Sequence, residues 1–283
     1  MKNYTKKDFN KMFPNDDACF EWLKNHLYPN GIECPVCHKV TLYSKIHNRP
    51  VYACDVCRHQ ISPLAGTIFE HSSTPLKTWF EAIFEMSTTR TGYSAKALQR
   101  STGVTYKTAW RMFKQIRSML GENTGKFTGE VEVDETYIGG KQAGKRGRGA
   151  EGKSIVVGAI QRQGSVTTAV VPDVKRHTLV PFVVNKVDRN AVLYTDEFPT
   201  YDHMARFGFN HFRIQHHDRV YVRGNVHTNN IEGFWSLVKR GIGGVYHNVS
   251  PEYLQSYVNE YSFRYNHRKD ETPMFQTFLN QIR

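Results

Sequence analysis

Residues 131–140 read VEVDETYIGG, a run in which apolar and polar side chains alternate until two glycines end it. Successive side chains of an extended strand point to opposite faces, so Val131 and Val133 can pack in a core while Asp134 faces the other way. A carboxylate placed in this manner is directed at a cleft. The pattern therefore predicts a β-strand over residues 130–138 that presents Asp134.

The sequence that follows this strand continues with alternating strand and helix signals. Apolar runs with strand periodicity predict further strands over 154–161, 165–171, 191–195 and 210–215. Apolar residues at helical spacing predict helices over 178–187, 199–207, 228–240 and 250–267. The order of these elements predicts an α/β domain of the ribonuclease H-like type, in which a mixed sheet carries helices on both faces.

Two further acidic residues stand at the ends of predicted elements. Asp196 follows the apolar run 191–194, at the carboxyl end of a strand, where open α/β sheets usually place ligand groups. Glu232 lies in the first turn of a helix, and Lys239 is seven residues further on, so both side chains project from one helix face. Together with Asp134 they form a candidate catalytic constellation.

Three carboxylates on structured elements are costly to ionise without cationic partners. Mg²⁺ or Mn²⁺ prefers such oxygen ligands, and two ions held by Asp134, Asp196 and Glu232 can stabilise both the attacking and the leaving oxygen of a phosphoryl transfer. The interpretation leaves open that His227, Asn229 or Asn230 supplements or replaces Glu232. Other nearby carboxylates are typical of turns and helix caps: Glu132, Glu135, Glu197, Asp202 and Asp218.

Four of the five cysteines form two C-x-x-C pairs separated by 16 residues, Cys34 with Cys37 and Cys54 with Cys57. This spacing predicts a zinc ribbon in which four thiolates hold one structural Zn²⁺ and residues 38–53 form a small hairpin. Haem attachment at the first pair is disfavoured because that chemistry normally requires export and because Arg58 instead of His follows the second pair. A redox pair is disfavoured because two matched pairs are better explained by one shared ion. The fifth cysteine, Cys19, is interpreted as a small buried hydrophobe.

Residues 74–122 have a helical pattern interrupted near Gly103, which is typical of a helix-turn-helix. The alternative is a plain helical hairpin with a solvated basic face. The DNA-binding interpretation expects the second helix to meet phosphates or base edges in a major groove through four basic side chains: Lys107, Arg111, Lys114 and Arg117.

The chain carries 38 Lys and Arg against 26 Asp and Glu, a formal charge of +12, which favours a polyanionic partner such as double-stranded DNA. The glycine-rich loop 139–153 and the helix after Glu232 supply further expected DNA contacts: Lys145, Arg146, Arg148, Lys239 and Arg240. No run of 18 apolar residues and no signal peptide is evident, so we expect a cytoplasmic, nucleoid-associated protein without a membrane partner.

These patterns divide the chain into four expected parts: an N-terminal helix (1–30), a zinc ribbon (31–70), the helix-turn-helix region (74–122) and the ribonuclease H-like catalytic domain (128–283). The ribbon and the helical region would bind DNA or support binding, and the last part would carry the chemistry.

The chain resembles the DDE transposases of bacterial insertion sequences, in the branch that carries an N-terminal zinc ribbon. The resemblance covers almost the whole sequence. It rests on the two cysteine pairs and on the stretches SPLAGTIFEHSSTPLKTWFEAI (62–83), VEVDETYIGGK (131–141), YTDE (194–197) and HTNNIEGFWSLVKRGIGGVYH (227–247), followed by YVNEYSFRYNHR (257–268).

The resemblance implies a transposase that binds the inverted-repeat ends of a mobile element, nicks them with metal ions and transfers the freed strands to a target, within a homo-oligomeric DNA complex. It assigns the metal-binding triad to Asp134, Asp196 and Glu232, and a DNA contact to Lys239. Two other functions stay open: a DNA-binding regulator with an inert catalytic fold, and a metal-dependent nuclease that hydrolyses DNA without strand transfer.

Overall fold

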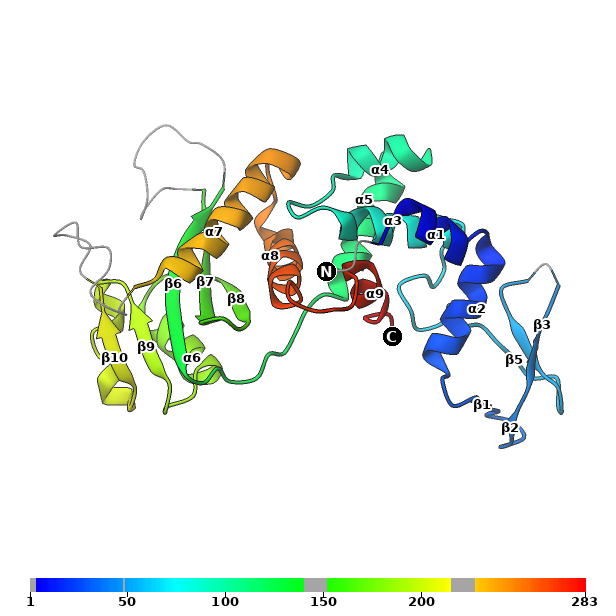
Figure 1. Ribbon diagram of the computed structural model, residues 1–283, viewed down its shortest axis with the longest axis horizontal. Helices are drawn as coiled ribbons and strands as arrows, with labels where there is room; N and C mark the ends of the chain where they lie inside the picture. The colour runs from blue at the N-terminus through cyan, green and yellow to red at the C-terminus, as the bar shows by residue number, and fades with distance from the viewer. Residues whose placement is uncertain (1–3, 48, 140–151, 215–226) are drawn as a thin grey trace. The chain divides into compact units, whose positions relative to one another are not determined.

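The computed structural model describes residues 4–47, 49–139, 152–214 and 227–283 (Figure 1). The chain forms two compact units. The first contains the residues up to Thr89 together with Ala95–Met119 and Asp270–Arg283, and the second contains Arg90–Ser94 and Leu120–Lys269. The chain therefore enters the second unit twice and returns to the first unit each time.

The first unit is mainly helical, with α1 (Lys6–Met12), α2 (Asp16–Leu27), α3 (Leu76–Thr88), α4 (Ala95–Thr102), α5 (Tyr106–Ser118) and α9 (Met274–Leu279). Its core is rich in aromatic rings. Phe275 of α9 packs against Phe9 and Phe13 with ring centroids 5.7 and 6.0 Å apart, and all three rings are buried. Residues 270–283, which the sequence pattern places in the catalytic domain, thus complete the core of the first unit.

The segment predicted as a helix-turn-helix forms α4, a short turn and α5. Gly103 ends α4 with φ +75°, a backbone conformation that favours glycine. Thr105 then caps α5, because its hydroxyl accepts a hydrogen bond from the backbone N–H of Thr108 at 3.2 Å. The turn is therefore specified by local residues.

One basic side chain expected on the exposed face of α5 lies in the core instead. Arg117 is only 3% exposed, and its guanidinium lies 5.6 Å from the ring centroid of Phe113. At about 100° per residue, ten residues rotate Arg117 roughly 80° away from Lys107, so Ser118 continues the exposed stripe. The prediction that Arg117 is exposed is wrong, whereas Lys107 is exposed as expected.

The cysteine-rich segment forms two small antiparallel sheets. In the first, β1 (Ile32–Glu33) pairs with β2 (Val40–Thr41). In the second, β4 (Tyr52–Cys54) lies between β3 (Tyr43–Lys45) and β5 (Gln60–Ile61). The hairpin predicted between the two cysteine pairs corresponds to β3 and β4.

The second unit is organised around a five-stranded mixed sheet in the order β10-β9-β6-β7-β8. Its strands are β6 (Glu130–Ile138), β7 (Ser154–Gln161), β8 (Val166–Val171), β9 (Val192–Thr195) and β10 (Asn210–Arg213). Strand β7 runs antiparallel to both neighbours, while β6, β9 and β10 are parallel. The sheet order and strand directions are those of a ribonuclease H-like fold, which confirms the predicted fold class.

Helices cover both faces of this sheet (Figure 1). On one face α6 (Arg176–Lys186) packs on Val131 and Val133, as the alternating pattern of β6 predicts. On the other face lie α7 (Asn229–Gly241) and α8 (Pro251–Asn266), which bury Val156 and Ile160 of β7. The face that carries Asp134 is therefore the face that α7 covers.

One helix prediction is wrong. Residues 199–207 form two short 3₁₀ turns, Pro199–Tyr201 and Met204–Phe207, and no α-helix. The buried side chains Tyr201 and Met204 are three residues apart, the spacing at which a 3₁₀ turn aligns side chains. Gly208, with φ +85°, then ends the segment.

Gly158 of β7 determines how closely α7 approaches the sheet. It lies opposite Asp134 in the register of β6 and β7. A Cβ atom at this position would lie 2.7 Å from Cζ2 of Trp235 and 3.1 Å from Cδ1 of Ile231. Only glycine admits the indole at this distance, so the packing of Trp235 places Glu232 near the strand that carries Asp134.

We expect Gly158→Ala to lower the free energy of unfolding by about 1–3 kcal/mol, because the added methyl group overpacks the contact with Trp235. Urea denaturation followed by far-UV circular dichroism measures the effect. Gly233→Ala is the matched control, since Gly233 lies in α7 with nothing within 4 Å of the new Cβ, and it should be neutral or stabilising. Equal stabilities for the two variants would contradict the packing argument.

Candidate active site and zinc centre

The four predicted zinc ligands lie together. Their sulfur atoms are all within 4.8 Å of one another, with Cys34 Sγ 3.5 Å from Cys57 Sγ and Cys37 Sγ 3.8 Å from Cys54 Sγ. A tetrahedral site with Zn–S bonds of about 2.3 Å requires S–S distances of about 3.8 Å. The geometry and the all-thiolate donor set therefore fit one structural Zn²⁺.

The two cysteine pairs have matching backbone turns. The N–H of His38 donates to the carbonyl of Cys34 at 2.8 Å, and the N–H of Arg58 donates to the carbonyl of Cys54 at 2.9 Å. His38 and Arg58 both have positive φ, 54° and 64°. Cys19 lies outside this group and is fully buried, and burial raises the pKa of its thiol to about 12, which fits the prediction of an inert hydrophobe.

Two of the three candidate metal ligands of the second unit follow from strand register. Strands β6 and β9 are parallel with Val133 opposite Thr195, so Asp134 and Asp196 are the next residue on each strand. Adjacent strands lie about 4.8 Å apart. Oδ1 of Asp196 accepts a hydrogen bond from the N–H of Phe198 at 3.0 Å, which orients this carboxylate at the end of β9.

The third candidate is positioned by a different carboxylate, Glu132. This side chain is fully buried, and its Oε2 accepts hydrogen bonds from the backbone N–H groups of Asn230 at 2.9 Å and Ile231 at 3.1 Å. A negative charge at a helix N-terminus is stabilising. Because Glu132 and Asp134 share one face of β6, this cap places the first turn of α7, with Glu232, on the same face.

Arg162 supplies the positive charge that Glu132 requires in the interior. Its Nε donates to Glu132 Oε1 at 2.8 Å, one terminal nitrogen to Glu130 at 3.2 Å and the other to the carbonyl of His227 at 2.9 Å. The guanidinium also lies 4.2 Å from the ring centroid of Tyr194. A buried carboxylate is tolerated only with such partners. The network fixes the residues that lead into α7 as well as the helix itself.

The sequence interpretation missed this network. It grouped Glu132 with carboxylates typical of turns and caps and did not single out Arg162. The available signal was the spacing of Glu132 from Asp134, two residues along a strand, which predicts a buried acid that needs a cation. The capping role depends on contact between β6 and α7, which are about 100 residues apart in the sequence.

Burial, together with the negative charges of Glu135, Asp196 and Glu232, raises the pKa of Asp134 to about 8. The carboxyl is therefore largely protonated at neutral pH in the metal-free protein. A divalent cation would reverse this balance, because it attracts the charged form of all three acids. The electrostatics thus fit a cation site between Asp134, Asp196 and Glu232.

Several of the other acids and alternative ligands are engaged elsewhere, while Asp218 lies outside the described residues. Glu135 lies on the opposite face of β6, where it accepts a hydrogen bond from Tyr201 Oη at 3.1 Å. Both Asn230 N–H groups, main-chain and side-chain, are directed at Glu132, and Nδ1 of His227 is 3.3 Å from the same carboxylate. Among the residues that the structure describes, the four cysteines alone form a group of ligands already close enough to hold a metal; the three acids do not.

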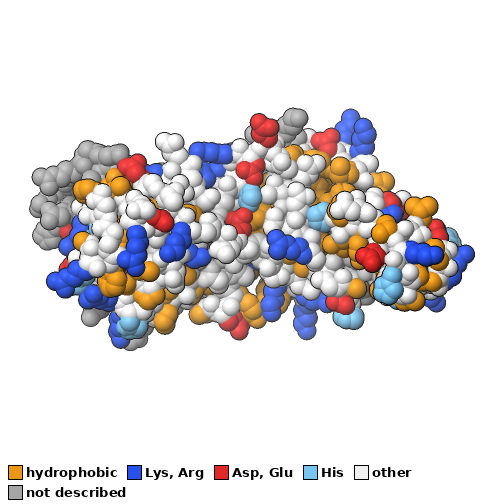
Figure 2. All heavy atoms as spheres, turned by 90° about the horizontal axis from the view of Figure 1, so that it is seen from below, with side chains coloured by type: hydrophobic (Ala, Val, Ile, Leu, Met, Phe, Trp, Pro, Cys, Tyr) orange, Lys and Arg blue, Asp and Glu red, His pale blue; other side chains and the backbone are white. Residues whose placement is uncertain are grey.

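Every predicted DNA contact that the structure describes is exposed, except Arg117. Lys107, Arg111 and Lys114 lie on the solvent side of α5, and Lys239 and Arg240 lie on the last turn of α7. Lys145, Arg146 and Arg148 lie outside the described residues. On the face drawn in Figure 2, Lys and Arg side chains are dispersed among acidic and apolar ones, so charge alone does not locate a DNA interface.

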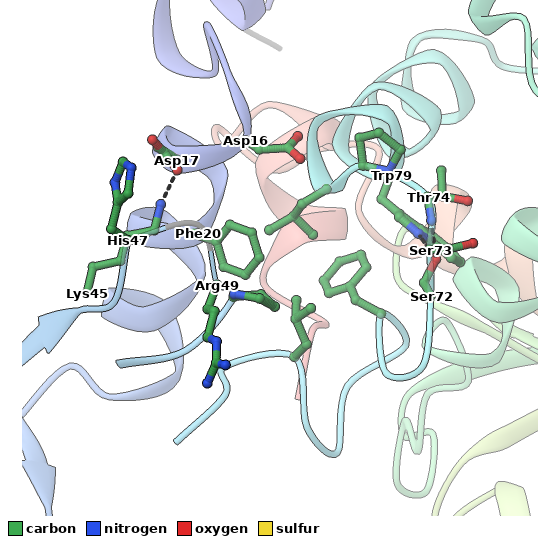
Figure 3. Close-up of a pocket in the computed structure, with 15 residues that line it drawn as sticks. Asp16, Asp17, Phe20, Lys45, His47, Arg49, Ser72, Ser73, Thr74 and Trp79 are labelled. Atoms are coloured by element: carbon green, nitrogen blue, oxygen red, sulfur yellow. Dashed lines mark hydrogen bonds and ion pairs between the residues drawn. The ribbon is translucent and has the colours of Figure 1, made fainter. Parts of the chain in front are cut away.

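A separate hollow of about 560 Å³ lies in the first unit (Figure 3). Acidic, basic and hydroxyl side chains surround it, including Asp16, Lys45, Arg49 and Ser72. Ser72 accepts hydrogen bonds from Trp79 Nε1 at 2.9 Å and from Arg111 at 3.3 Å. The mixture of charges does not select one class of ligand.

Comparison with protein families separates the chain into two matched regions. Residues 126–266 match the ISXO2-like transposase domain, and residues 14–60 match the transposase zinc-ribbon domain. The chain belongs to the ISXO2-like family of DDE transposases. The four-cysteine centre is thus the zinc site of a transposase zinc ribbon, and the mixed-sheet unit is the transposase domain.

Two relatives are also similar to this chain in sequence. An uncharacterized protein in the transposable element ISH50 of Halobacterium salinarum is 27% identical over 274 residues, which span 90% of this transposase and 92% of the relative. An uncharacterized transposase-like protein of Haemophilus influenzae is 34% identical over 101 residues, 36% of this chain and 80% of that one.

Solved structures give only distant similarities. A simian T-cell lymphotropic virus intasome in complex with a PP2A regulatory subunit matches with a TM-score of 0.33 and 12% identity over 70% of this chain and 74% of that one. A pre-cleavage Mos1 transpososome matches with a TM-score of 0.31 and 12% identity over 74% and 80%. None of the helices that the structure describes is long and apolar enough to cross a membrane.

Replacing one zinc ligand should empty the zinc centre. We expect Cys34→Ser to remove bound zinc and unfold the ribbon, because its few short strands cannot support a core without the metal. Zinc content by atomic emission and limited proteolysis of the purified transposase measure both effects. Cys19→Ala, which removes a buried thiol outside the centre, should keep its zinc; retention of zinc by Cys34→Ser would refute the assignment.

We expect Glu132→Gln to lower the free energy of unfolding by about 3 kcal/mol, since it leaves Arg162 and two helix N–H groups without a buried negative charge. Glu130→Gln is the matched control, because Glu130 binds the same arginine but is 38% exposed. It should cost under about 1 kcal/mol. Chemical denaturation of both variants provides the measurement, and similar values for the two would exclude Glu132 as the anchor of α7.

Proposed function

We propose that this transposase cuts DNA at the ends of its mobile element and joins the freed 3′-hydroxyl groups to a target. In this proposal Asp134, Asp196 and Glu232 hold two Mg²⁺ or Mn²⁺ ions. The observation that carries it is that Asp134 and Asp196 each directly follow one of the paired residues Val133 and Thr195 of the parallel strands β6 and β9. A buried cap also brings the first turn of α7 to the face of β6 that carries Asp134.

The protein's own residues would position the reaction. Such a pair of ions, when bound, activates a water or a 3′-hydroxyl as nucleophile and stabilises the leaving oxygen. Asp134 binds as the carboxylate, and its raised pKa of about 8 makes proton loss and metal binding linked events. Glu132 and Arg162 keep α7 in place. Lys239, exposed in the last turn of the helix, contacts a DNA phosphate.

The first unit would supply recognition of the element ends. The exposed basic side chains of α5, Lys107, Arg111 and Lys114, would contact the DNA backbone or base edges, with the capped turn at Thr105 setting the direction of the helix. Cutting and joining two element ends requires two active sites, so we propose that the transposase acts as a homo-oligomer on DNA.

The test incubates the purified transposase with labelled element-end DNA and supercoiled target, with and without Mg²⁺, and resolves nicked from joined products. Joined products that require Mg²⁺ support the proposal. Nicked or hydrolysed products without joining indicate a nuclease. DNA binding without any metal-dependent product indicates a regulator.

In the same assay Asp134→Ala should reduce cleavage by roughly three orders of magnitude or more, since a cation ligand of the reaction is removed, while DNA binding is retained. Asp202→Ala is the matched control, because Asp202 is an exposed aspartate of the same unit that pairs with Arg213 at 2.7 Å. It should cut normally. Cleavage by Asp134→Ala at the rate of the Asp202 control would reject the assigned triad.

A further inference from the structure

A small cavity of about 170 Å³ opens at the C-terminal end of α7. One wall is the end of β6, at Tyr137 and Gly139, and the other includes Lys239, Gly243 and His247. The cavity therefore lies on the strand that carries Asp134 and the helix that carries Glu232. At 1.5 Å rise per residue, Lys239 is about 10 Å along the helix axis from Glu232.

The backbone around this cavity is irregular. The α-helical hydrogen bonding of α7 gives way to a π-helical turn over Ile242–Tyr246, a feature found frequently at functional sites. His247 follows with φ 60° and ψ −45°, and the N–H of Asn248 donates to the carbonyl of Tyr246 at 2.7 Å. This is a γ-turn at a residue other than glycine, a strained conformation that holds an exposed imidazole at the cavity.

Two exposed glycines in the π-helical turn have no structural explanation within the fold. Gly241 is required by packing, since its Cβ would lie 2.8 Å from the carbonyl oxygen of Thr91. Neither Gly243 nor Gly244 has a positive φ that would require glycine, and a Cβ at either would meet nothing within 4 Å. Glycine lowers helix stability relative to alanine, and packing does not require glycine at these two positions. We therefore infer that the two glycines leave room for a bound molecule to approach the backbone of the turn.

The charge of the site selects an anion. Lys239 and Arg240 are exposed, and Lys239 makes no ion pair with any of the residues that the structure describes. None of the described side chains that line the cavity is acidic. The volume corresponds to about five or six water molecules, which suits a single phosphate group with part of its hydration.

We propose that this cavity binds one phosphate of the DNA backbone, held by Lys239, His247 and Asn248, and that Gly243 allows the sugar-phosphate chain to approach the helix. The inference rests on the proposed function, because a DNA strand that reaches the Asp134 carboxylate along α7 passes this point. It adds Gly243, His247 and Asn248 to the DNA contacts that the sequence analysis expects at Lys239 and Arg240.

The test measures binding of a fluorescein-labelled, mixed-sequence DNA duplex to the full chain by anisotropy over a range of KCl concentrations, without Mg²⁺, so that no cleavage contributes. Lys239→Ala and His247→Ala should each weaken binding by about 5–10-fold, and Lys239→Ala should reduce the slope of log K against log salt by about one unit. Lys175→Ala and His177→Ala are matched controls, since both residues are exposed at the start of α6, on the opposite face of the sheet.

Gly243→Ala separates the proposed contact from a structural role. The new methyl group has room and favours the helix, so the midpoint of thermal unfolding should rise by roughly 2 °C, while DNA binding weakens by about threefold. Higher thermal stability combined with weaker DNA binding supports the proposed phosphate-binding cavity. Unchanged binding in Gly243→Ala, or values for Lys239→Ala and His247→Ala equal to their controls, would overturn it.

The two proposals fail in different ways. If the wild-type protein binds DNA through these residues but yields no Mg²⁺-dependent product, the proposed function is contradicted and the phosphate-binding cavity is still supported. If the wild-type protein cuts and joins DNA but the cavity variants bind DNA like their controls, only the phosphate-binding cavity is contradicted.

Discussion

The structure of the transposase unit depends on one buried carboxylate. Glu132 stands in the central strand of the sheet, receives two backbone N–H groups of α7 and is neutralised by Arg162. Burying a charge is unfavourable unless it is paired and hydrogen bonded, and here both conditions are met from separate elements. The contact between β6 and the first turn of α7 is thereby a specific charge-assisted one, which a purely apolar surface between helix and sheet would not provide.

As a consequence, two acidic residues of the same strand have different roles in the candidate active site. Glu132 and Asp134 are two residues apart on the same face of β6. Glu132 is paired with Arg162, whereas Asp134 is surrounded by other acidic side chains. Glu132 has cationic and N–H partners within the protein, whereas a bound cation would offset the negative charge around Asp134. Gly158 and Trp235 bring α7 close enough for both functions to share one face.

Much of this arrangement is predictable from the sequence, and the exceptions have physical causes. Strand alternation predicted that Val131 and Val133 would pack and that Asp134 would face away, because that rule concerns only neighbours along a strand. The four cysteines were predictable because their spacing is local within each pair. Arg117 was misplaced because helical rotation over ten residues accumulates, and residues 199–207 because a 3₁₀ turn and an α-helix share similar apolar spacing. The Glu132 cap and the return of α9 were not accessible, since both depend on tertiary contacts across long stretches of chain.

The packing of Phe275 against Phe9 and Phe13 also has a consequence for biosynthesis. A ribosome completes α9 only after every residue of the transposase domain has been made. Part of the aromatic core of the first unit therefore stays open until the transposase domain and then α9 have been synthesised. A chain that stalls within the transposase domain would expose this core, which marks it as a target for chaperones and proteases.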